Sequence, residues 1–67
     1  MSTSTYRVTG MTCDHCVASV REEVAEVAGV SAVDVELASG RLTVTGEGFT
    51  DADVRAAVDE AGYEVAP

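Results

Sequence analysis

The sequence contains no lysine and only four arginines, against twelve Asp and Glu residues, which leaves a formal charge of −8. Such a surface repels phosphate backbones and anionic lipids, so the shortage of basic residues argues against nucleic-acid and membrane-surface binding. No apolar run approaches the length of a membrane-spanning helix, so we expect no membrane insertion. The charge balance suits a cationic ligand or a partner with a basic patch.

Aromatic residues are also scarce, because the chain of 67 residues has no tryptophan, one phenylalanine and two tyrosines. A chain this short buries only about 60% of the surface that its unfolded form exposes, so we expect one small domain over residues 1–67. It leaves no room for a deep substrate cleft, and we therefore expect a protein that is not an enzyme. The N-terminal stretch MSTSTYRV lacks the apolar segment of a signal peptide, which predicts a cytoplasmic location.

The hydrophobic periodicity predicts two helices and four strands. Strands are expected at residues 4–9, 31–37, 41–45 and 63–65, with one helix from about Cys16 and another after Thr50. This βαββαβ order is that of the ferredoxin-like α+β fold. It predicts a four-stranded antiparallel sheet with both helices on one face.

Local signals predict the turn between the second and third expected strands. Ser39-Gly40 can form a two-residue hairpin turn, which predicts that Leu37 lies opposite Leu42 and Val35 opposite Val44. All four side chains then share one face of the sheet, as a half-buried sheet requires.

Capping residues mark the ends of the helices. Gly29 is placed to follow the last turn of the first helix in the left-handed conformation. Thr50 is the expected N-cap of the second helix, with Asp51 and Asp53 in its first turn, and Gly62 is expected to end that helix.

The chemistry of the chain is concentrated in GMTCDHC, residues 10–16, where Cys13 and Cys16 are the only cysteines. Cys13 is expected in the loop and Cys16 at the start of the first helix, whose N-terminus stabilises thiolates over thiols. In a reducing compartment such a pair is more typical of a metal or catalytic site than of a structural disulfide. Two sulfurs do not complete a tetrahedral zinc site, whereas Cu(I) favours thiolates and accepts two of them.

At these residues the sequence resembles the heavy-metal-associated domain family, whose motif is G-M-x-C-x-x-C, and within it the small bacterial copper chaperones. The resemblance covers essentially the whole chain, including the spacing to Gly62-Tyr63. It implies that Cys13 and Cys16 bind Cu(I) and pass it by ligand exchange to the CxxC metal-binding domain of a copper-transporting P-type ATPase. An acceptor sulfur would join the ion before a donor sulfur leaves, so the ion is never bare.

Three neighbours of the cysteines are candidates for modulating the metal site. The resemblance implies that Met11 turns inward and supports the loop, although its thioether is also a soft ligand. It also implies that Tyr63 lies beside the metal loop, where the phenol can shield the metal or pack in the core. His15 is either an exposed polar residue or a group that tunes the thiolates, and we expect it not to be a ligand in the monomer.

Other functions remain open at this point. The CxxC pair also occurs in thiol–disulfide oxidoreductases, but those domains are longer and usually carry tryptophan or proline about the motif. A binding module for Zn(II), Cd(II) or Hg(II), or a sensing domain of a larger ATPase, is a second alternative, and a purely structural module is a third. An exposed pair of sulfurs would also allow copper to bridge two copies into a homodimer.

Overall fold

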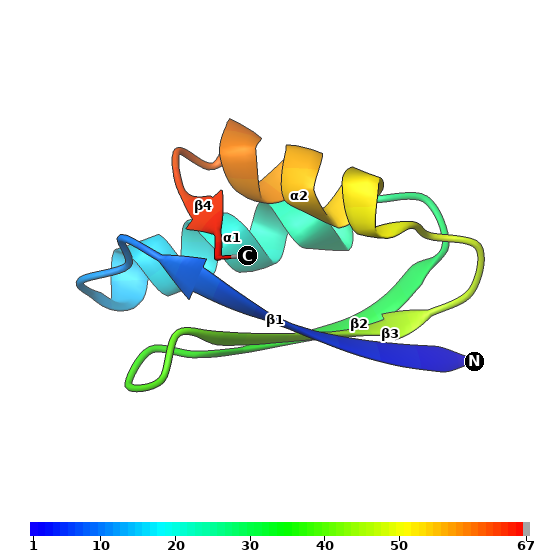
Figure 1. Ribbon diagram of the computed structural model, residues 1–67, viewed down its shortest axis with the longest axis horizontal. Helices are drawn as coiled ribbons and strands as arrows, with labels where there is room; N and C mark the ends of the chain where they lie inside the picture. The colour runs from blue at the N-terminus through cyan, green and yellow to red at the C-terminus, as the bar shows by residue number, and fades with distance from the viewer. Residues whose placement is uncertain (67) are drawn as a thin grey trace.

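A computed structural model describes residues 1–66 of the chain. The elements are β1 (Ser2–Thr9), α1 (Asp14–Ala25), β2 (Val30–Glu36), β3 (Arg41–Gly46), α2 (Asp51–Glu60) and β4 (Glu64–Val65). The strands pair antiparallel in the order β2-β3-β1-β4. Both helices lie on one face of this sheet (Figure 1), so the predicted ferredoxin-like βαββαβ architecture is confirmed. No described helix is long and apolar enough to cross a bilayer.

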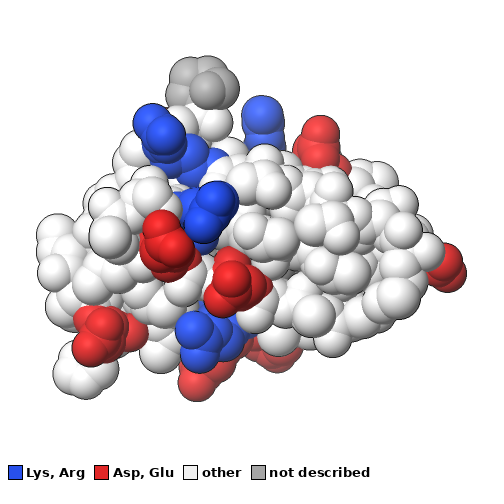
Figure 2. Space-filling model, turned by 90° about the horizontal axis from the view of Figure 1, so that it is seen from below, with Lys and Arg blue, Asp and Glu red and all other residues white. Residues whose placement is uncertain are grey.

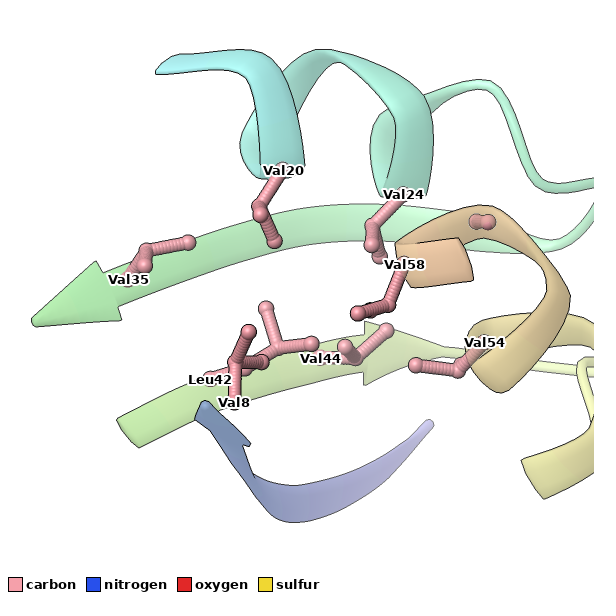
Figure 3. Close-up of a cluster of buried hydrophobic side chains, with 9 residues drawn as sticks. Val8, Val20, Val24, Val35, Leu42, Val44, Val54 and Val58 are labelled. Atoms are coloured by element: carbon pink, nitrogen blue, oxygen red, sulfur yellow. The ribbon is translucent and has the colours of Figure 1, made fainter. Parts of the chain in front are cut away.

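The core lies between the helices and the covered face of the sheet, and valine supplies most of it (Figure 3). Val20 and Val24 point down from α1, Val54 and Val58 from α2, and all four are fully buried. Leu42 and Val44 of β3, also fully buried, meet them from the sheet. Complete burial of one such side chain contributes about 1.5–3 kcal/mol. The helical spacing of the valines therefore determines which face of each helix packs on the sheet.

The hairpin between β2 and β3 differs from the prediction. Its loop has four residues, 37–40, and Val35 lies opposite Leu42, with Val33 opposite Val44. The predicted pairing of Leu37 with Leu42 was wrong by two residues. The shift leaves the apolar side chains on the covered face, because a displacement of two residues preserves the alternation. Gly40 closes the loop through its N–H to the Glu36 carbonyl, 2.9 Å, and accepts the Val8 N–H from β1, 2.7 Å.

The first helix ends earlier than expected, at Ala25, with Glu26 as its C-cap. Gly29 therefore does not cap it. Gly29 has φ +91°, and a Cβ there would lie 2.0 Å from the Glu47 carbonyl oxygen. The Gly29 carbonyl in turn accepts the Glu47 N–H at 2.8 Å. This glycine is needed because two backbone segments touch at that point.

Candidate metal site

The two cysteines occupy the N-terminus of α1. Cys13 is the N-cap residue, with φ −156° and ψ 173°, and Cys16 is the third residue of the helix. Side chains at these two positions meet over the first turn, and the Sγ atoms lie 3.5 Å apart. Cys13 is exposed, whereas Cys16 is only 9% exposed. One sulfur therefore faces the solvent and the other is held against the protein.

The surroundings of Cys16 favour its thiolate. A backbone hydrogen bond at Thr12 and then a side-chain hydrogen bond from Tyr63 lower the pKa of Cys16 to about 6, against the opposing effect of burial. The Cys13 side chain adds a smaller effect in the same direction. Because the thiolate is the form that binds metals, this sulfur is in its metal-binding form at neutral pH.

Tyr63 reaches the site because of the way α2 ends. The Gly62 N–H donates to the Asp59 carbonyl at 2.9 Å, and the Tyr63 N–H donates to the Val58 carbonyl at 3.1 Å. This pair of bonds is a Schellman motif, which needs a residue in the left-handed region, and Gly62 has φ +91°. The predicted role of Gly62 in ending the helix is confirmed. The turn directs the phenol to the cysteines, and the contact with Cys16 raises the pKa of Tyr63.

Met11 and His15 differ in burial. Met11 is half-buried and packs against the hydrophobic core. His15 is exposed in the first turn of α1, and its carbonyl accepts the Ser19 hydroxyl at 3.1 Å. Within residues 1–66 there is no group of three or more His, Cys, Asp or Glu side chains placed to hold a metal. The described structure thus brings together the two cysteines and Tyr63, without a third ligand of these types.

Thr12 was not among the residues predicted for the site. Its backbone makes the largest contribution to the low pKa of Cys16, and its hydroxyl lies 3.9 Å from the Cys16 sulfur. Its place directly before Cys13 is the only signal in the sequence that could have drawn attention to it.

Comparisons with known proteins agree with this geometry. Residues 5–64 match the heavy-metal-associated domain. The chain is 40% identical over 68 aligned positions to the copper chaperone CopZ of Bacillus subtilis (strain 168), covering 98% of this chain and 99% of that protein. It is 37% identical to a zinc/cadmium/lead-transporting P-type ATPase of Shigella sonnei (strain Ss046), over 90% of this chain but 8% of the ATPase. A solved CopZ metallochaperone superposes with a TM-score of 0.93 at 28% identity, over 97% of this chain and 100% of that one. The chain belongs to the heavy-metal-associated domain family.

Proposed function

We propose that this protein is a cytoplasmic Cu(I) chaperone that carries the ion between the thiolates of Cys13 and Cys16. The observation that carries the proposal is the pair of sulfurs 3.5 Å apart with no third ligand group among residues 1–66. Zn(II) sites normally use four ligands, whereas Cu(I) is a soft ion that favours thiolates and accepts two. The similarity to proteins named as copper chaperones supports the same choice of metal. The role is carriage, and we propose no catalytic step.

Delivery would proceed by ligand exchange with a metal-binding domain of a copper-transporting P-type ATPase. The exposure of Cys13 supports an encounter in which an acceptor thiolate bonds to the ion on that side. One donor bond then breaks for each acceptor bond that forms, so the number of sulfurs on the ion does not fall below two. A segment of a metal-transporting P-type ATPase is itself similar in sequence to this chain, which supports a donor and an acceptor of the same fold.

Three further residues would modulate the site. Tyr63 would stabilise the Cys16 thiolate and shield the ion, and Met11 would hold the loop in place from the core side. His15, exposed beside the cysteines, would tune the thiolates through its charge. In a His15→Ala variant we expect a change in the thiol pKa values or in Cu(I) affinity. If both quantities stayed at their wild-type values, His15 would have no part in the site.

A second candidate is a binding domain for Zn(II) or another divalent soft metal. The similarity to a zinc/cadmium/lead-transporting ATPase favours it. Such an ion would need ligands beyond the two sulfurs, from a neighbouring side chain or from a second molecule. Competition between Cu(I) and Zn(II) therefore separates the two candidates.

The decisive experiment titrates the reduced apo protein with Cu(I), and separately with Zn(II), against chelators of known affinity. We expect Cu(I) to bind far more tightly than Zn(II). Molecular mass is followed in parallel, because copper shared between two copies would appear as a metal-dependent dimer. Tighter binding of Zn(II) than of Cu(I) would reject the copper proposal.

A further inference from the structure

The sheet has an edge that its own strands leave open. The short strand β4 pairs only with Val8 and Thr9, although β1 begins at Ser2. Among residues 1–66, no strand pairs with the N-terminal half of β1 on the side away from β3. Figure 1 shows this half of β1 extending well past β4.

Two hydrogen bonds establish which backbone groups face the open edge. The Val8 N–H donates to the Gly40 carbonyl toward β3, and the Ala66 N–H donates to the Arg7 carbonyl on the β4 side, both at 2.7 Å. Alternate residues of a strand direct their N–H and C=O groups to the same side. Thr3 and Thr5 therefore direct theirs to the same side as Arg7, where no described strand lies. An open edge of this kind is a template for an added strand.

A groove of about 450 Å³ runs along this edge. It lies between β1 and α2, and its lining is Ser4, Thr5, Tyr6, Arg7, Asp51, Arg55, Val65 and Ala66. Asp51 is already engaged, because it accepts the Tyr6 hydroxyl at 2.7 Å. The bond leaves the carboxylate charged, so the lining holds two guanidinium groups against one carboxylate.

The arginines of the groove are unusual in so acidic a chain. The ion pairs among the described residues are Met1–Glu47 and Glu36–Arg41, so neither Arg7 nor Arg55 has a carboxylate partner there. Arg7 also lies directly opposite Arg41, and like charges in that position are destabilising. Figure 2 shows the basic side chains interspersed with acidic ones on the uncovered face of the molecule. With Arg41 paired to Glu36, the two arginines and Asp51 leave one excess positive charge in the lining, which an anion would neutralise.

We propose that the open edge of β1 binds a short, extended, acidic segment of a partner protein as an added strand. Successive side chains of a strand point to opposite faces. One carboxylate would thus meet Arg55 on the face that the helices cover, and the next would meet Arg7 on the uncovered face. The backbone of Thr3 and Thr5 supplies the hydrogen bonds, and the arginines supply the selectivity. The negative charge of the rest of the chain disfavours longer acidic tracts, so two adjacent carboxylates fit best.

This surface is separate from the cysteines, because no residue of segment 10–16 lines the groove. Binding of a strand at this edge is therefore independent of metal binding at the cysteines. The probe is a capped hexapeptide of valine and threonine with a central Asp-Glu pair, and the matched probe carries Asn-Gln instead. Binding is followed by amide chemical shifts of the isotope-labelled apo protein. We expect saturable shifts at Thr3, Thr5 and Arg7 with the acidic peptide.

Two kinds of variant test the contacts. Arg7→Gln and Arg55→Gln should each weaken binding by about threefold, as expected for an exposed charge pair. Arg21→Gln on α1 makes the same change of charge away from the groove and should leave the affinity unchanged. Thr5→Pro removes a donor on the open edge alone and should also weaken binding. Equal binding of the Asn-Gln peptide, an equal loss in Arg21→Gln, or shifts confined to other surfaces would each overturn the proposal.

Discussion

The two helices of the protein begin in the same way but use their first turns differently. Each N-cap residue is extended, with φ −156° at Cys13 and −119° at Thr50. In α2 the Thr50 hydroxyl accepts the Asp53 N–H at 3.2 Å, and the Asp53 carboxylate accepts the Thr50 N–H at 3.3 Å. In α1 the N-cap side chain makes no such bond. The Cys13 carbonyl instead accepts from both Cys16, at 3.1 Å, and Val17, at 3.3 Å.

The same two positions thus serve stability in one helix and chemistry in the other. A capping box joins residues three apart at the start of a helix, and CxxC has the same spacing. Where oxygen groups fill these positions they satisfy backbone donors, and where sulfurs fill them the two side chains face each other at 3.5 Å. Functional sites commonly give up stability in this way. Substitutions at these positions test the difference between the two helix starts.

The largest effect is expected from replacing both sulfurs. Cys13→Ser with Cys16→Ser keeps the size of both side chains but removes the soft ligands, so Cu(I) binding should be lost in a competition titration. The matched control is Thr50→Ser, which makes a conservative change at the N-cap of α2 and should leave Cu(I) binding intact. Copper binding at wild-type strength in the double variant would rule out the cysteines as ligands.

The next effect concerns pH. Because the pKa of Cys16 is lowered from 9.0 to about 6, its thiolate persists over that range in the folded protein. The ionised sulfur therefore adds to folding stability above the pKa of the unfolded thiol. This contribution to stability is lost as the pH falls through about 6. Tyr63→Phe removes a hydrogen bond to the sulfur and should raise the pKa of Cys16. The measurement is the alkylation rate of the apo protein against pH, with Tyr6→Phe as the control far from the site. An unchanged midpoint in Tyr63→Phe would show that the phenol does not stabilise the thiolate.

Features that depend on neighbours in the sequence could be predicted. Thr50 and Gly62 were identified correctly because an N-cap and a Schellman turn are local patterns. The hydrophobic periodicity that predicted the two helices comes largely from valines at helical spacing, and most of these valines are buried. The place of Cys13 and Cys16 at the start of α1 followed from the same kind of pattern.

Features that depend on distant segments were not predictable in this way. The hairpin register was missed because Gly40 contacts Val8 of β1, and the role of Gly29 was missed because it touches Glu47. No local pattern assigns such contacts. The effect of Thr12 on the pKa of Cys16 could not be predicted for a related reason. It depends on the conformation of the loop before α1.

A smaller effect, on stability, is expected at the start of α2. Thr50→Ala removes the side-chain acceptor of the capping box and should lower the free energy of unfolding by about 1 kcal/mol. Urea unfolding of the apo protein measures it, and Thr50→Ser, which keeps the hydroxyl, should lose much less. Metal affinity should be unchanged, since the change leaves both sulfurs in place. A loss of copper binding in Thr50→Ala would mean that the two helix starts are not independent.

The smallest effect should have the opposite sign, at the start of α1. Cys13→Ser supplies the hydroxyl acceptor that this helix lacks, so the apo protein should become more stable by about 0.5 kcal/mol. Cys13→Ala removes the same sulfur without adding an acceptor, and the difference between the two variants in urea unfolding isolates the cap. Copper should stabilise the wild type but neither variant, because only the wild type keeps both ligands. Equal stability of the serine and alanine variants would mean that the bonds to the Cys13 carbonyl already satisfy the backbone donors of the first turn of α1. The cysteine at the N-cap would then carry no cost in stability.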